Sequence, residues 1–204
     1  MVILIDRDKL KNPLRLEGRA VILDEIQPKY FPYVIEWRNN PKLNRFLNQP
    51  FELTMELETN WYEKKYLHDN TQGFLVMIDK ETMTPFGTTG WTDFDAEKRR
   101  LIGGRLILGN SHYANKPAFV EAFVILGDYL YDFVDIQYGH VVKENRRAIR
   151  FNKFFGSVEN KGEIQYPHEL FVNGMEQIEF YRTKEMYLEI RKNIYEFLED
   201  VLFT

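Results

Sequence analysis

The residues best suited to chemistry lie within residues 101–156, where a strand turns through a short loop into a long helix. The strand reads LIGGRLILGN, the loop SHYANK and the helix PAFVEAFVILGDYLYDFV. The first N–H groups of a helix have no partner inside the helix, and the positive end of the helix dipole lies there. A strand, a loop and a helix in this order therefore aim free N–H groups at one point, which suits a phosphate group.

Composition narrows the class of protein. The chain has 204 residues, of which 44% are hydrophobic and 28% charged, as in an ordinary single globular domain. The net charge of −4 argues against a nucleic-acid partner, because nucleic-acid binders usually carry a basic surface. The absence of cysteine excludes disulfides and a thiol nucleophile, so a catalyst must use carboxylates, histidine, tyrosine, asparagine or backbone groups.

Two further patterns bear on metals and membranes. The four histidines show no metal-ligand spacing, so we expect no catalytic metal. No apolar run reaches the roughly 18 residues of a membrane span, and charges interrupt the first residues too early for a signal peptide. We therefore expect a cytoplasmic protein with no membrane partner.

Apolar periodicity predicts elements in the order β, α, α, β, β, β, α, β, α, β, β, α, which indicates an α+β fold with helices on the faces of a sheet. The predicted strands cover residues 14–26, 74–79, 86–95, 101–110 and 137–142, followed by a hairpin in 163–182 that turns at Val172, Asn173 and Gly174. The predicted helices cover residues 27–40, 55–69 with Thr54 as N-cap, 117–134, 145–155 and 184–203. We divide the chain into a domain, residues 1–183, and a C-terminal helix, residues 184–204, that packs on the domain or forms a dimer interface.

Several short motifs occur in an order typical of one family. The N-terminal half has a strand followed by a helix ending in W-R-N-x-P, and the C-terminal half has Asn145-x-x-Ala148–Ile149 followed by Phe155–Gly156. These motifs span residues 14–183 and resemble the GNAT N-acetyltransferases, in particular the branch with the ribosomal-protein acetyltransferases RimJ and RimL. The resemblance implies a mixed, mostly antiparallel central sheet flanked by helices, with the C-terminal helix added. It also implies acetyl-coenzyme A (acetyl-CoA) as co-substrate and direct acetyl transfer to an amine.

The resemblance further implies where acetyl-CoA binds. In a GNAT fold the strand at 101–110 diverges from the strand at 137–142, and the pantetheine arm pairs with the backbone that this exposes, at Leu106, Ile107 and Leu108. The pyrophosphate is then expected on the loop formed by Tyr113, Ala114, Asn115, Lys116, Pro117 and Ala118. Asn145 is expected to bind the pantetheine or orient the thioester. Arg150 is expected to contact the 3′-phosphate, although its basic cluster (Arg146, Arg147, Arg150 and Lys153) equally suits a solvated helix face.

Some positions depart from the family pattern. Asn115 and Pro117 stand where the phosphate loop usually has glycines, and Pro117 lacks the N–H that would bind phosphate, a loss that Lys116 partly offsets. Asn152 stands where many relatives have a tyrosine that protonates the departing thiolate. An asparagine can hydrogen-bond sulfur but is a poor acid.

Acetyl transfer also needs a group that accepts a proton from the amine. We favour Asp93, near the predicted cleft, with a solvated hairpin residue as the alternative. A role in the reaction is also open to His140 and to Glu121. The simpler interpretation of His140 is a structural histidine, and that of Glu121 is a glutamate that caps a helix or packs in the core. Glu36 and Trp37 border the acceptor pocket in one reading, and in the other Trp37 belongs to the core.

Two functions stay open on this basis. The first is an N-acetyltransferase whose acceptor is a small-molecule amine, such as an amino sugar, or the N-terminus of a peptide. The second is a binding or regulatory module that keeps the GNAT fold but has lost turnover, which Pro117 and Asn152 favour.

Overall fold

The computed structural model describes residues 8–166, 171–172 and 174–202. One sheet runs through these residues, with the strand order β1-β2-β3-β4-β5-β6-β9-β7 and with β8 paired to β9. The strands are β1 Arg15–Glu17, β2 Val21–Glu25, β3 Gly73–Asp79, β4 Pro85–Asp95, β5 Arg100–Leu108, β6 Ile136–Val142, β7 Val158–Glu159, β8 Phe171–Val172 and β9 Met175–Thr183. All pairs are antiparallel except β5 with β6, so the sheet is mixed and mostly antiparallel, as predicted.

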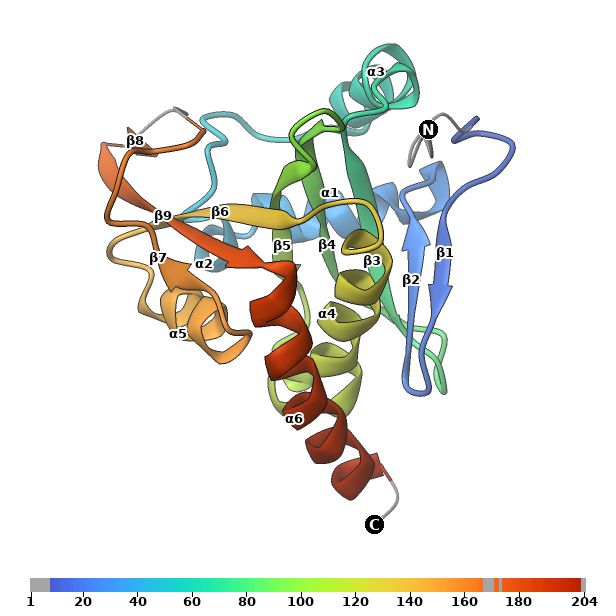
Figure 1. The fold of residues 1–204 in the computed structure, drawn as a ribbon. Helices are drawn as coiled ribbons and strands as arrows, with labels where there is room; N and C mark the ends of the chain where they lie inside the picture. The colour runs from blue at the N-terminus through green and yellow to red at the C-terminus, as the bar shows by residue number, and fades with distance from the viewer. Residues whose placement is uncertain (1–7, 167–170, 173, 203–204) are drawn as a thin grey trace.

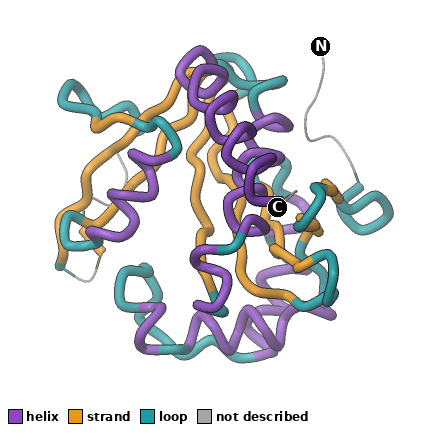
Figure 2. The backbone as a smooth tube through the Cα atoms, turned by 90° about the horizontal axis from the view of Figure 1, so that it is seen from below, coloured by secondary structure: helices purple, strands orange, loops and turns teal. Residues whose placement is uncertain are grey.

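Helices cover both faces of the sheet (Figures 1 and 2). Figure 1 shows α1 behind the strands and α4 and α6 in front of them. The α-helices are α1 Phe31–Asn39, α2 Pro41–Asn44, α3 Met55–Lys64, α4 Pro117–Leu130, α5 Arg146–Phe154 and α6 Lys184–Leu202, and single 3-10 turns cover Pro28–Tyr30, Tyr66–His68 and Ser111–Asn115. No helix in the described part of the chain is both long enough and apolar enough to cross a membrane.

Each face of the sheet has its own apolar core. One core joins alternate residues of β2, β3 and β4 to α4, and it includes Leu23, Trp91 and Ala122, each fully buried. The other joins the intervening strand residues to α1 and α3, and it includes Val34 and Tyr66. The two-residue alternation of the strands therefore assigns successive side chains to opposite cores.

The N-terminal strand differs from the prediction. The sequence pattern indicates one strand over residues 14–26, but the structure divides it into β1 and β2, a hairpin that turns at Gly18. An added Cβ at Gly18 would lie 2.5 Å from the Glu121 carboxylate, so the turn needs a residue without a side chain. The alternation of apolar residues continues across the turn, which is why the pattern alone does not reveal it.

Glu121 holds this hairpin to the long helix. Its carboxylate, 4% exposed on α4, accepts hydrogen bonds from the backbone N–H groups of Arg19 (2.7 Å), Ala20 (2.7 Å) and Val21 (3.2 Å). Of the two interpretations of Glu121, the structure supports packing. The contact joins residues about a hundred positions apart in the chain and fixes β1 and β2 against the helix that follows the candidate phosphate loop.

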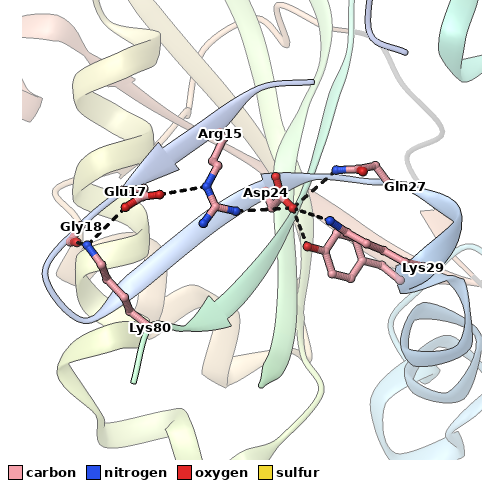
Figure 3. Close-up of polar contacts among 8 residues, drawn as sticks. Arg15, Glu17, Gly18, Asp24, Gln27, Lys29 and Lys80 are labelled. Carbon is pink, nitrogen blue, oxygen red and sulfur yellow. Dashed lines mark hydrogen bonds and ion pairs between the residues drawn. The ribbon is translucent and has the colours of Figure 1, made fainter. Parts of the chain in front are cut away.

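A second buried carboxylate fixes the start of the first helix (Figure 3). Asp24 of β2 is 3% exposed and accepts hydrogen bonds from the Tyr30 hydroxyl and from Lys29 Nζ at 3.2 Å. Arg15 of β1 lies 3.7 Å from the same carboxylate. These contacts link β1, β2 and the turn that leads into α1, so the helices behind the sheet begin at a defined place.

The C-terminal helix packs on α4 of its own chain. Tyr187 is 2% exposed, and its hydroxyl oxygen lies 2.8 Å from the Val124 carbonyl oxygen. Asp128 of α4 accepts hydrogen bonds from Tyr187 (2.5 Å), Tyr195 (3.0 Å) and Arg191 Nη2 (2.9 Å). These hydrogen bonds from Arg191 and the two tyrosines lower the pKa of Asp128 despite its partial burial.

We predict that Glu121→Gln destabilises the fold. A glutamine offers one acceptor oxygen where the carboxylate offers two, so buried N–H groups of the hairpin lose their partner, at a cost of about 1–3 kcal/mol. Chemical denaturation measures the change, with the exposed Glu189→Gln on α6 as the matched control. Equal unfolding free energies for the two variants would contradict the role of Glu121.

Candidate functional site

The central feature of the site is the separation of β5 from β6. The two parallel strands pair only at Arg100 with Ile136, Leu101 with Gln137 and Ile102 with Tyr138. Beyond Ile102, β5 continues to Leu108 paired with β4, while β6 continues to Val142 paired with β9. The facing edges of β5 and β6 therefore carry backbone N–H and C=O groups outside the ladder, which is the divergence that the resemblance implies.

A cavity of about 290 Å³ occupies this separation. Glycines form much of its strand walls, with Gly103 and Gly104 on β5 and Gly139 on β6. A Cβ added at Gly104 would meet no atom within 4 Å, so this position opens directly into the cavity. The helical walls come from α4, α5 and the segment around α2, through residues such as Phe123, Phe151, Leu43, Phe46 and Leu47.

Asn152 lines the cavity on the α5 side. Its Nδ2 donates to the Ala148 carbonyl at 2.9 Å, so Oδ1 is the amide atom left toward Gly139, 3.8 Å from the position of an added Cβ there. The orientation matters for chemistry, because the group nearest β6 is an acceptor. Asn152 therefore presents an oxygen to this wall rather than the donor that the thiolate role assumed.

His140 lines the same cavity from β6, on the other face of the sheet from Asn152. Side chains alternate along a strand, so His140 shares a face with Tyr138, and Gly139 faces the opposite way, toward Asn152. The His140 ring nitrogen Nε2 lies 3.2 Å from the carboxylate of Glu179, its direct partner on β9. The side chains of His140 and Glu179 are 10% and 1% exposed.

Asn145 stands at the start of α5 and lines the cavity. Its Oδ1 accepts a hydrogen bond from the Ala148 N–H at 3.1 Å, which makes it the N-cap of the helix. The predicted helix over residues 145–155 begins at Asn145, and in the structure Asn145 follows the turn after β6 and is the N-cap of α5. The cap fixes the side chain so that Nδ2 is the group available for a ligand.

A second hollow, of about 490 Å³, lies where α4 begins. Ala114, Asn115, Lys116 and Pro117 line one side, and α5 and α6 line the other through Arg147, Arg150, Phe154, Phe197 and Val201. Arg150 and Arg147 thus face the predicted phosphate loop, whereas Arg146 and Lys153 of the same basic cluster do not line it. The hollow combines cationic and aromatic side chains, which suits a nucleotide.

The predicted phosphate loop divides into two parts. Residues 111–115 form a 3-10 turn rather than an irregular loop, and Tyr113 within it is 8% exposed and stacks on Phe86 at 4.2 Å between ring centroids. Ala118 is also buried, in the core beneath α4. The side chains of Tyr113 and Ala118 therefore serve packing, and Ala114, Asn115, Lys116 and Pro117 are the loop residues that face the hollow.

Several sequence candidates lie away from the cavity. Asp93, the favoured proton acceptor, is exposed near the end of β4 with a left-handed φ of 53°, and it does not line the cavity. Leu106 lines the cavity, but Ile107 and Leu108 do not. Trp37 is 6% exposed and packs against Gly109 at the end of β5, so the core interpretation holds for it. Glu36 is exposed outside the cavity.

A buried polar cluster borders the cavity behind β5. Arg105 lines the cavity, has a left-handed φ of 55°, and places its guanidinium 5.4 Å from the Trp61 ring centroid. Burial lowers the pKa of Arg105 to about 10, so the side chain stays cationic at neutral pH. Burial also raises the pKa of Glu58, whose Oε1 has no hydrogen-bond partner among the described residues. Among those residues, no cluster of three or more His, Asp or Glu side chains could hold a metal ion.

Two further residues of the site, Glu179 and Arg105, are not among the candidates predicted from the sequence. Glu179 lies in the strand stretch Ile178–Glu179–Phe180, where a charged residue between apolar ones signals a buried carboxylate with partners. The identity of the partner depends on the register of β6 with β9, which the sequence does not show. The signal for Arg105 is the pair of glycines before it, because glycines are unusual inside a strand and often mark a bulge.

We predict that two substitutions of Asn145 separate its capping role from its amide N–H₂ group. Asn145→Ala removes the N-cap and destabilises the protein by about 1 kcal/mol. Asn145→Asp keeps an acceptor oxygen and loses only the donor, so it retains stability near that of the wild type. Thermal unfolding of both variants tests this, and equal losses of stability would contradict the capping role.

Comparison with known proteins places this geometry in a recognised fold. No family model matches the chain, and no curated protein matches its sequence. Solved structures do match. The spermidine N-acetyltransferase of Vibrio cholerae, in complex with CoA and spermine, has a TM-score of 0.71 at 18% identity, covering 84% of this chain and 99% of that one.

Two further matches agree with the first. A GCN5-related N-acetyltransferase from Brucella melitensis has a TM-score of 0.73 at 18% identity, covering 92% of this chain and 86% of that one. FdhC, a nucleotide-linked sugar GNAT, has a TM-score of 0.72 at 19% identity, covering 92% of this chain and 99% of that one. The chain therefore has the GNAT fold, with the mixed, mostly antiparallel sheet, the flanking helices and the C-terminal helix.

Proposed function

We propose that this protein is an acetyl-CoA-dependent N-acetyltransferase that transfers acetyl directly to an amine. The observation that carries the proposal is the separation of β5 from β6, which leaves an unpaired strand edge beside a cavity. Structures with the same fold include one in complex with CoA and spermine, and another described as a nucleotide-linked sugar GNAT. The RimJ/RimL-like branch, a cytoplasmic location and a homodimer stay predictions from the sequence.

The pantetheine arm of acetyl-CoA fits the unpaired edge of β5. Pantetheine contains amide groups, so it pairs with a strand edge as an added peptide strand does. The edge offers the backbone of residues 103–108, including Leu106, Ile107 and Leu108. Asn145 adds a side-chain donor on the opposite wall. This binding needs no particular side chain on β5, so it tolerates the departures in the phosphate loop.

The nucleotide end of CoA fits the second hollow. Lys116 and the residues at the start of α4 lie on one side, where the helix dipole favours an anion. Arg150 and Arg147 lie on the other side and provide cations for the phosphates. Pro117 occupies the first position of α4 and withholds one N–H, so charge from these side chains replaces part of the backbone cradle.

The acceptor is a small molecule such as an amino sugar, in preference to a polyamine. Binding a polycation requires carboxylates, and no aspartate or glutamate is found among the described residues that line the cavity. The charged residues there are Arg105 and Arg182, which favour neutral or anionic molecules. The leucines and the phenylalanine near α2 give this side of the cavity an apolar wall.

The rival function is a module that binds CoA without turnover. Pro117 and Asn152 favour this module. Pro117 lacks the backbone N–H that a glycine would offer to phosphate, and Asn152 presents an oxygen where many relatives have a tyrosine hydroxyl. The two functions share cofactor binding and differ in product formation. Restoring glycine at 117 and tyrosine at 152 should raise CoA affinity in a degenerate module, and should leave an intact enzyme unchanged or impaired.

We predict that CoA binding protects β5 from amide hydrogen exchange. CoA at about 100 times its Kd stabilises the native state by about 2.7 kcal/mol, so Tm rises. In exchange mass spectrometry, peptides over residues 103–110 and 114–120 should slow strongly, while residues 15–17 at the far edge of the sheet should not. Unchanged Tm and exchange at millimolar CoA would contradict cofactor binding in the separation of β5 and β6.

We predict that the protein acetylates an amino sugar linked to a nucleotide faster than it acetylates spermidine. Mass spectrometry of product formed from acetyl-CoA, with peptide N-termini as a third class, measures the preference. Gly104→Val should abolish transfer and keep Tm, because its side chain enters the open cavity without meeting protein atoms. Binding of CoA without product from any amine would support the non-catalytic module, and a preference for spermidine would overturn the acceptor class.

A further inference from the structure

The buried carboxylate of Glu179 accepts hydrogen bonds from three donors in the segment that follows β7. It accepts from Asn160 Nδ2 (2.6 Å), the Gln165 N–H (3.1 Å) and the Tyr166 N–H (3.2 Å), besides its contact with His140. These donors place residues 160–166 against the carboxylate and fix its position beside the histidine. Glu179 is therefore a rigid acceptor, 3% exposed, behind the cavity-lining His140.

This acceptor sets the proton positions on His140. A carboxylate has no proton to donate, so the Nε2 atom 3.2 Å away carries the hydrogen and points it at Glu179. In the neutral ring the basic nitrogen is then Nδ1. A carboxylate behind a histidine also stabilises the imidazolium that forms when the ring gains a proton, as in carboxylate–histidine pairs of hydrolases.

The two faces of β6 carry different parts of the site. Asn152 and the start of α4 lie on one face, where the cofactor is proposed to enter. His140 lies on the other face, and Gly139 between them has no side chain to close the passage. A group that removes a proton from the acceptor amine must lie on the acceptor side of the thioester, which is the side of His140.

We propose that His140 is the proton acceptor of the reaction and that Glu179 is its positioning residue, an inference that rests on the proposed N-acetyltransferase function. His140 takes one proton from the acceptor ammonium and leaves a neutral amine. The amine nitrogen attacks the thioester carbonyl carbon, so a C–N bond forms and the C–S bond breaks with its electron pair on sulfur. The nitrogen then loses its surplus proton to the thiolate, and His140 returns its proton to solvent.

Other ionisable groups face His140 across the sheet surface. Burial raises the pKa of Tyr166 to about 12 and also raises that of Tyr138, so both stay neutral at working pH. The guanidinium of Arg100 lies 4.4 Å from the Tyr166 ring centroid. Among the described residues, the titratable and charged groups on this face include Glu179 and Tyr181 of β9, Tyr138 of β6, Arg100 and Arg105 of β5, and Tyr166 of the loop.

The test compares wild type with His140→Ala and with the control His68→Ala, an exposed histidine outside the cavity. The amine is the best acceptor found by screening amino sugars, polyamines and peptides with acetyl-CoA. We expect His140→Ala to lower kcat/KM roughly 100-fold, to keep the rise in Tm caused by CoA, and to regain activity when imidazole is added. Glu179→Gln should also lower kcat/KM, and Glu179→Asp should restore part of it.

The pH profile separates a catalytic from a structural role. The ratio of wild-type to His140→Ala kcat/KM isolates the contribution of His140. It should shrink as the pH falls, because a protonated His140 cannot accept a proton, and shrink again above the pKa of the acceptor ammonium, because the amine is then neutral without His140. A pH-independent ratio without imidazole rescue would overturn the inference.

The remaining outcomes are also decisive. An active wild type with an equally active His140→Ala would overturn the inference and leave the proposed function intact. Loss of the CoA-induced rise in Tm in both His140→Ala and His140→Asn would assign the residue a structural role and overturn the inference. A wild type that binds no CoA and acetylates no amine overturns the proposed function and the inference together.

Discussion

The site depends on one constraint, which is that β5 and β6 stay paired over three residues and then part. Each strand keeps its other neighbour, so the sheet remains intact on both sides of the break. The β4–β5 ladder shifts register between Thr88 and Gly90, where the Thr88 hydroxyl donates to the Arg105 carbonyl at 2.7 Å. Unpaired backbone groups inside a protein are costly, so a sheet that leaves them free provides a place for a ligand with amide groups.

The glycines on the two walls keep the space between β5 and β6 open for a ligand. Side chains at 103, 104 and 139 would fill the space between the strands, and their absence joins the two faces of the sheet through one cavity. The two faces then carry different chemistry. Lys116, Arg147 and Arg150 lie beside α4 and α5, while the histidine–carboxylate pair and Arg105 lie with the apolar wall near α2. The rest of the fold holds these faces in place, through Glu121 at the hairpin and Asp128 beneath α6.

The sequence predicts the elements well and their contacts poorly. Strands 74–79, 86–95 and 101–110 and the helices at 55 and 117 are confirmed, because apolar periodicity and the Thr54 cap are local signals. The turn at Gly18 is missed, since alternation continues through it. The first arm of the predicted C-terminal hairpin begins at residue 163, but residues 163–166 form no strand. Residues 167–170 and Asn173 lie outside the described residues, and β8 with β9 forms the described part of the hairpin.

Long-range partners account for what the sequence misses in the site. The strands of Glu179 and His140 pair directly, yet the two residues are 39 positions apart in the chain. The sequence places Tyr113 in a loop, but in the structure its ring stacks on the ring of Phe86. Asp93 seems well placed by its strand alone, but β4 continues past the cavity before it reaches this residue. Sequence patterns therefore predict which face of a strand or helix carries a side chain, but they do not predict which residue that side chain contacts.

A crystal structure with CoA bound tests the central claim most directly. The account predicts electron density for pantetheine between β5 and β6, hydrogen-bonded to the backbone of residues 103–108, with the nucleotide beside Lys116 and Arg150. Density for CoA at another place on the protein, or a fully paired β5 edge with no CoA at saturating concentration, would contradict it.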